Sequence, residues 1–192
     1  MKDNGFFGTF ICLFLVVFLL TGCAYQKIQL ASEAEKLVRV AINEAVPGNM
    51  KAEISAYKMS EDKVRLVISA HLLNDALPSS TSPYVRGSYT TNAKLTSLAT
   101  DRCAKVMQNI INQKFEFEVG QIVVNVNHGV RLTTVYRGSY RSSSTKDVAM
   151  TLIIVSLNIK EIQNKNPSIS EIQNTWRVKK NIINSISIVS GY

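Results

Sequence analysis

Two histidines are the residues of this 192-residue chain best suited to acid–base chemistry. His71 lies within the apolar stretch VRLVISAHLL, where a structural role is the default for an imidazole. His128 follows the alternating stretch QIVVNVN, at the expected end of a strand, and would be better placed as a general base. Asp147 and a serine between Ser139 and Ser144 would complete a hydrolase triad. No G-x-S-x-G elbow supports that triad, so a hydrolase using His128 is the least favoured function.

Other motifs of catalysis are missing from the sequence. It contains no P-loop, G-x-G-x-x-G, H-E-x-x-H, cysteine pair or Asp-rich calcium loop. The neighbouring acids Glu61 and Asp62, and the nearby Glu116 and Glu118, are expected at strand ends rather than as a glycosidase couple. The sequence therefore predicts a protein that is not an enzyme and that needs no cofactor or metal.

The four letters RGSY occur twice, and both copies combine an arginine with flanking tyrosines. One centres on Arg86 and the other on Arg137. If the two polar loops meet, they would form an aromatic rim with two guanidinium forks, suited to an anionic glycan or an acidic partner. The sequence enters a predicted helix after the first copy and a predicted strand after the second, which argues against a repeated module. The predicted binding residues are Tyr84, Arg86, Tyr89, Tyr136, Arg137 and Tyr140.

The N-terminal segment has the pattern of an export signal. Residues 4–22 carry no charge, and their apolar core is followed by LLTGCAYQK. This resembles the lipobox of bacterial lipoproteins, with Leu20, Thr21 and Gly22 ahead of Cys23. The resemblance implies that Cys23 receives a diacylglycerol, and that the signal peptidase removes residues 1–22. Cys12 lies in the same apolar run, but bulky residues precede it. The alternative is an uncleaved membrane anchor.

The resemblance also implies a location. Ala24, the second residue after cleavage, favours the outer membrane of a diderm bacterium, with the domain facing the periplasm. In a monoderm the same signal would place the protein on the outer face of the cell membrane. Residues 23–31 would then be the lipidated cysteine and a short tether, followed by a single domain over residues 32–192. Two or three acyl chains would anchor it to the membrane firmly.

The part that would remain after processing is basic. The chain has 22 Lys and Arg and 14 Asp and Glu, and residues 1–22 contain one of each, Lys2 and Asp3, so the net charge of +8 belongs to the domain. A basic surface beside a membrane favours anionic headgroups, acidic glycans or an acidic protein. We expect no nucleic acid as partner because the location is outside the cytoplasm. The third cysteine, Cys103, is expected in the core because it shares one predicted helical face with Leu95, Ala99, Val106 and Ile110.

The hydrophobic periodicity predicts eight elements. A helix begins at Ser32, with Glu35 completing a capping box, and strands follow at about 51–58 and 63–73. After a long polar loop, a helix spans about 91–114, and the next strand ends in a turn at 127–129. The apolar run from Val148 to Ile159 is expected as a strand at the sheet centre. A short helix begins after Ser168, again with a capping box, and the last strand covers Asn184–Val189.

The predicted order, α-β-β-α-β-β-α-β, indicates an α+β fold with a largely antiparallel sheet and helices on one face. The first five elements resemble, in order alone, the ring-building domains of secretion-system lipoproteins and the lipid-associated BON domains. That resemblance implies an alternative function, a ring or scaffold subunit of a secretion or conjugation machine. The favoured function is a non-enzymatic binding or structural lipoprotein of the cell envelope; the oligomeric state stays open.

Overall fold

The fold is built on one six-stranded sheet. The structure is a computed structural model, and it describes residues 25–48, 52–73, 92–136 and 142–183. The strands are β1 (Gln26–Ile28), β2 (Glu53–Lys58), β3 (Lys63–Ala70), β4 (Glu118–Tyr136), β5 (Ser142–Asn158) and β6 (Arg177–Asn181). The helices are α2 (Ser32–Ala45), α3 (Asn92–Ile111) and α4 (Ile169–Thr175), with a short 3₁₀ helix, η1, at Ile159–Glu161.

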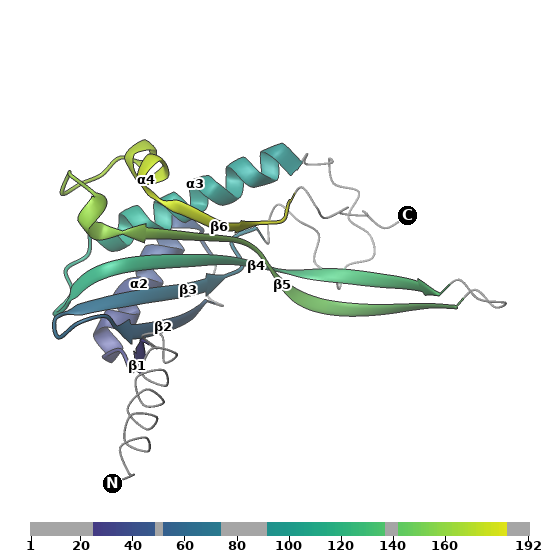
Figure 1. The fold of residues 1–192 in the computed structure, drawn as a ribbon, viewed down its shortest axis with the longest axis horizontal. Coiled ribbons are helices and arrows are strands. Elements are labelled where there is room, and N and C mark those ends of the chain that lie inside the picture. Colours follow the sequence, from purple (N-terminus) through teal and green to yellow (C-terminus); the bar gives the residue numbers. More distant parts are fainter. Residues whose placement is uncertain (1–24, 49–51, 74–91, 137–141, 184–192) are drawn as a thin grey trace, which may run out of the picture.

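The strands lie side by side in the order in which they occur along the chain (Figure 1). Neighbouring strands run antiparallel except β3 and β4, which are parallel. Helix α3 lies between these two strands in the sequence, because a parallel pair needs a long crossover. The predicted α+β class with a largely antiparallel sheet is confirmed.

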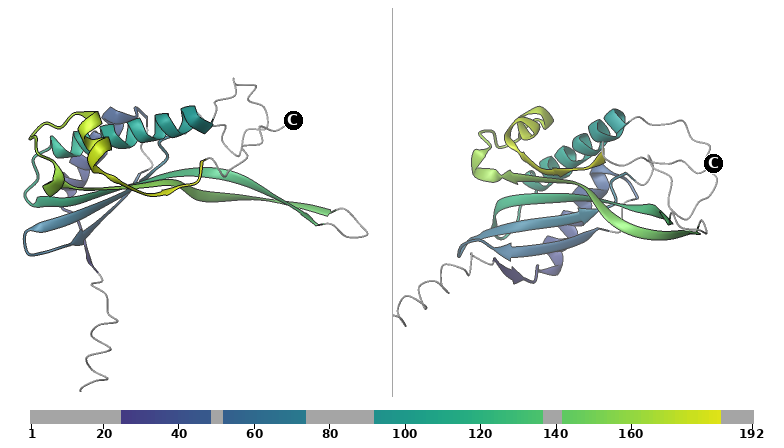
Figure 2. Two further views of the ribbon diagram at one scale, coloured as in Figure 1. Left: turned by 45° about the horizontal axis from the view of Figure 1, so that its top comes forward. Right: turned by 45° about the vertical axis from the view of Figure 1, so that its right-hand side comes forward.

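All three helices cover the same face of the sheet (Figure 2). The core between the two layers contains alternate residues of the strands, such as Leu66 and Ile68 of β3 and Ile122 and Val124 of β4. Helix α3 contributes the predicted stripe, in which Leu95, Ala99, Cys103, Val106 and Ile110 are all buried. No described helix lies on the opposite face, which we call the uncovered face.

The N-terminal part differs from the prediction in two ways. The capping box at Ser32 is wrong: the residue at the N-cap is Ala31, without a side-chain hydrogen bond, and Glu35 instead forms an ion pair of 2.7 Å with Arg39. The second difference is β1, which pairs with β2 inside the segment expected to be a tether. The sheet therefore begins three residues after Cys23.

The predicted turn at 127–129 is also wrong. β4 continues through Asn127, His128 and Gly129 to Tyr136, and β5 begins at Ser142, within the stretch expected to be a polar connection. A register shift between Val126 and Asn127 marks the position where the prediction ended the strand. β4 and β5 therefore form a hairpin that extends well past the rest of the sheet (Figure 1).

The C-terminal part contains one confirmed cap and two differences. The Ser168 side chain caps α4 by accepting a hydrogen bond of 3.2 Å from the Glu171 N–H, as predicted. β5 is the fifth strand rather than the centre of the sheet, although β4 and β6 flank it. β6 follows α4 directly at Arg177–Asn181, where no strand was predicted. The strand predicted at 184–189 lies outside the described residues.

Candidate functional site

The residues proposed for a hydrolase triad are not assembled in the described chain. His128 lies inside β4, is 7% exposed, and is paired in register with Met150. Asp147 is paired with Arg131, three positions farther along β4, which is about 10 Å at 3.3 Å per residue. The serines at 142–144 pair with residues 134–136, at least about 20 Å from the position of His128 by the same spacing. Ser139 lies outside the described residues.

Most of the other predicted site residues also lie outside the described residues. These are the lipobox residues Leu20, Thr21, Gly22 and Cys23, and the RGSY residues Tyr84, Arg86, Tyr89, Arg137 and Tyr140. Tyr136 is the last residue of β4 and pairs with Ser142. The meeting of the two RGSY loops stays a prediction.

The described residues hold few groups for metal or thiol chemistry. Within them, no three His, Cys, Asp or Glu side chains are grouped closely enough to hold a metal ion. Cys103 is fully buried, as predicted, and the burial raises the pKa of its thiol by desolvating the thiolate. None of the described helices is both long and apolar enough to cross a membrane.

Polar side chains instead gather on the uncovered face, in a row that crosses five strands. The strand register places Lys27 opposite Tyr57, Tyr57 opposite Arg65, Arg65 opposite Gln121, and Gln121 opposite Asn158. Residues opposite one another in register lie on the same face. The core-side neighbours of Arg65 in β3, Val64 and Leu66, are buried. We call Lys27, Tyr57, Arg65, Gln121 and Asn158 the polar row.

Hydrogen bonds fix the amides of this face. Gln121 Nε2 donates to Asn158 Oδ1 at 2.8 Å, and Asn158 Nδ2 donates to Glu161 Oε1 at 2.7 Å. A second pair joins β3 and β4 on the same face, where Asn125 Nδ2 donates to Ser69 Oγ at 3.0 Å. Side chains held in this way present their remaining donor and acceptor positions in fixed directions, which is what a binding surface requires.

Arg65 is the central charge of the row. Its Nε is buried and has no hydrogen-bond partner in the part of the chain that the structure describes. Its Cζ lies 5.3 Å from the centre of the Tyr25 ring, in cation–π geometry. Tyr25 is 41% exposed, and Lys27 beside it is also exposed. Because a guanidinium stays charged and offers its donors as a planar fork, Arg65 is suited to a carboxylate or a phosphate.

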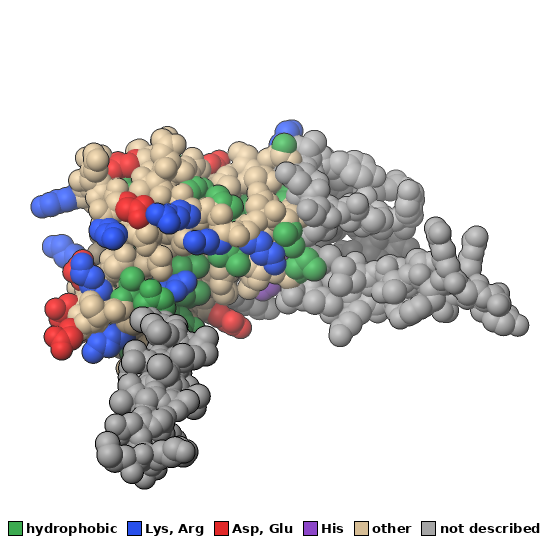
Figure 3. Space-filling model, in the orientation of Figure 1, with side chains coloured by type: hydrophobic (Ala, Val, Ile, Leu, Met, Phe, Trp, Pro, Cys, Tyr) green, Lys and Arg blue, Asp and Glu red, His purple; other side chains and the backbone are tan. Residues whose placement is uncertain are grey.

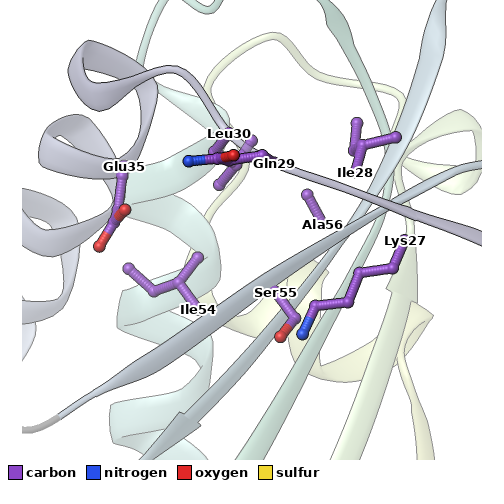
Figure 4. A pocket seen from close by; sticks show the side chains of 8 residues that line it. All are labelled: Lys27, Ile28, Gln29, Leu30, Glu35, Ile54, Ser55 and Ala56. Carbon is purple, nitrogen blue, oxygen red and sulfur yellow. The ribbon is translucent and has the colours of Figure 1, made fainter.

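A shallow hollow of about 360 Å³ lies at the β1 end of the row. It is open to solvent, and Figure 4 shows Lys27 and Ser55 on one side of it and Glu35 of α2 on the other. Ile28, Leu30, Ile54 and Ala56 supply its apolar lining. This volume is at the small end of ligand sites, and the apolar lining belongs to the core side of the sheet, so we treat the hollow as a recess at the β1 edge and not as part of the uncovered face.

The sequence contained a signal for this face that the prediction did not use. Tyr57, Arg65 and Gln121 each stand beside an apolar, inward-facing residue of the same strand, and this alternation places them on the outer face. The register that brings them into one row depends on the parallel β3–β4 pairing, which no local pattern specifies. Elsewhere on the surface seen in Figure 3, basic and acidic side chains both occur, and Lys and Arg side chains are most numerous across the middle of the body.

Comparison with known proteins adds no family. A scan against protein-family models and searches of curated proteins and solved structures found no match to this chain. The function has to be inferred from the residues and their arrangement.

Proposed function

We propose that this protein is a non-enzymatic bacterial lipoprotein. It is attached through Cys23 to the cell envelope, at the outer membrane and facing the periplasm, and its uncovered face binds an anionic group. The group is a phosphate or a carboxylate, carried either by a lipid headgroup or by an envelope glycan. The proposal combines the LLTGC sequence with the chemistry of the polar row.

The observation that carries this proposal is the position of the Arg65–Tyr25 pair. Tyr25 comes two residues after Cys23 in the sequence, and its ring stacks against the Arg65 guanidinium on the uncovered face. An extended chain spans at most about 3.6 Å per residue, so Tyr25 would lie within roughly 7 Å of the lipidated cysteine. A lipid on Cys23 would therefore hold the polar row close to the anionic groups of the membrane surface.

The experiment first tests the anchor. The mass of the N-terminal peptide from the purified protein is expected to show cleavage before Cys23 and addition of acyl chains. Cys23→Ser is expected to abolish both, so that the apolar residues 1–22 stay on the chain. An unmodified wild-type peptide would overturn the lipoprotein part of the proposal.

Binding is then measured on the Cys23→Ser full-length protein in detergent. The probes are inorganic phosphate, an oligosaccharide of uronic acids, and mixed detergent micelles containing phosphatidylglycerol, with micelles containing phosphatidylcholine as control. Arg65→Ala is expected to lower the affinity for the preferred probe at least tenfold, because hydrogen bonds to a charged group, worth about 1.5–3 kcal/mol, are lost. Lys105→Ala removes one positive charge from an exposed position of α3, on the other face of the sheet, and is expected to change affinity less than twofold. Equal loss in both variants would show that only net charge matters.

The ring or scaffold subunit is retained as a second candidate because of one observation. The β4–β5 hairpin projects from the sheet as a long two-stranded ribbon, a form typical of elements that contact other chains (Figure 1). A ring or scaffold function predicts that a second protein contacts the hairpin in cells.

A further inference from the structure

The outer half of the β4–β5 hairpin is a two-stranded arm. β3 pairs with β4 only as far as Val126, and β6 pairs with β5 only from Ile153 onward. From the pair Asn127–Thr151 to the pair Tyr136–Ser142, β4 and β5 are paired only with each other in the described chain. These ten pairs extend about 30 Å at 3.3 Å per residue. We call residues 127–136 and 142–151 the arm.

Beyond His128, no strand of the described residues pairs with either outer edge of the arm. After β3 the chain leaves the sheet, because Leu72 and Leu73 are fully buried in the core. On the other side, the Ile182 N–H donates to the Leu152 carbonyl at 3.0 Å, and the described chain ends at residue 183. Each outer edge therefore presents alternate N–H and C=O groups that no described strand satisfies.

An arm of this kind is a weak structure by itself. An isolated two-stranded hairpin is at best marginally stable in water, and a third strand usually makes such a sheet stable. Natural proteins also avoid long open edges, because these pair with other chains. A ribbon of ten pairs with two open edges is consequently expected to gain order when another strand adds to it.

The charges decide which kind of chain that strand comes from. Between Asn127 and Thr151 the sequence has four basic residues, Arg131, Arg137, Arg141 and Lys146, and one acid, Asp147. The outermost strand of the body on the other side, β6, is basic as well, with Arg177, Lys179 and Lys180. Like charges on pairing strands are destabilising, so arm-to-arm or arm-to-β6 pairing between two copies of this chain is disfavoured.

We propose that an edge of the arm binds an extended acidic segment of another protein by β-strand addition. Backbone hydrogen bonds from the open edge would supply much of the affinity, and the excess of basic over acidic residues in the arm sequence would select acidic over basic segments. A glycan could meet the same charges, but it has no peptide ladder to pair with the edge, so the open backbone favours a peptide. This inference is independent of the anion site proposed for the polar row.

The test uses full-length protein in detergent and a ten-residue peptide of alternating valine and aspartate. Amide hydrogen exchange is followed residue by residue by NMR with and without the peptide. The expected result is that alternate amides of one arm strand, those directed outward, exchange at least tenfold more slowly with the peptide bound. The matched peptide with lysine in place of aspartate is expected to bind at least tenfold more weakly.

Variants separate the edge from general charge. The double variant Arg131→Glu with Lys146→Glu is expected to lower the affinity for the acidic peptide at least tenfold. The control double variant on β6, Lys179→Glu with Lys180→Glu, is expected to change this affinity less than threefold. An oligosaccharide of uronic acids is expected to leave the exchange of the arm amides unchanged.

Three results would overturn the proposal. The outward amides could already be protected in the free protein, which would mean that the arm is covered. The acidic and basic peptides could protect them equally. Protection could also rise with protein concentration alone, together with a dimer mass, in which case a second copy occupies the edge.

Discussion

At the residue scale, Cys103 is a core side chain whose sulfur substitutes for a small apolar group. It is fully buried between α3 and the sheet, and burial raises the pKa of its thiol, so the nucleophilic thiolate is not formed at neutral pH. In a Cys12→Ala, Cys23→Ser protein, where Cys103 is the remaining thiol, we expect thiol reagents to react only on unfolding. The measurement is the labelling rate against urea concentration; rapid labelling of the native protein would contradict it.

A capping box in the sequence predicted the cap in the structure only where no other side chain competed for its carboxylate. Ser168 and Glu171 formed the expected cap, with the Ser168 hydroxyl on the Glu171 N–H. The same pattern at Ser32 failed, because Arg39 lies one turn after Glu35 and takes its carboxylate. Arg39 also donates to the Ala52 carbonyl at 3.2 Å, a contact that depends on tertiary structure. The capping motif could be read from the sequence, but the competing partner could not be weighed without the fold.

At the element scale, the start of α4 depends on one exposed carboxylate. Asn164 Nδ2 donates to Glu171 Oε2 at 2.7 Å, and this bond, followed by backbone N–H groups, lowers the pKa of Glu171. A lowered folded-state pKa means that the contribution to stability is present above the ordinary glutamate range, about 4.3, and is lost as the pH falls through the folded pKa. We expect Asn164→Ala to raise the Glu171 pKa toward the ordinary value in an NMR titration. Asn174→Ala, on the same helix, is the control; an unchanged Glu171 titration in Asn164→Ala would contradict this.

Helices and strands were predictable where the hydrophobic periodicity was strong. They were not predictable where pairing with a distant strand decides whether the chain stays extended. The alternation of β3 and the apolar stripe of α3 gave those elements to within a few residues. The Asn127–Gly129 stretch suggested a turn from composition, yet the chain stays extended because β5 pairs with it residue by residue. The next residues, Val130 and Leu132, continue the alternation and were a signal for the longer strand. The polar row depends on the same kind of long-range pairing.

At the scale of the whole molecule, the layered α+β architecture follows from composition and periodicity, but the separation into a body and an arm does not. The core of the body includes Val126 of β4 and Leu152 of β5, and Met150 at the base of the arm packs against it. Pairing beyond them involves only β4 and β5. The body should therefore fold without the arm.

The test is to delete residues 129–149 and join His128 to Met150, which are paired in register, with Asn-Gly, a sequence favoured in two-residue hairpin turns. We expect the free energy of unfolding to change by less than about 2 kcal/mol, because a two-stranded ribbon is marginal and shortening a connection costs little entropy. The single tryptophan, Trp176, packs against the core of the body, so its fluorescence reports unfolding there. The same variant should lose binding of the acidic peptide. Loss of the cooperative Trp176 transition would show instead that the arm is part of the folding unit.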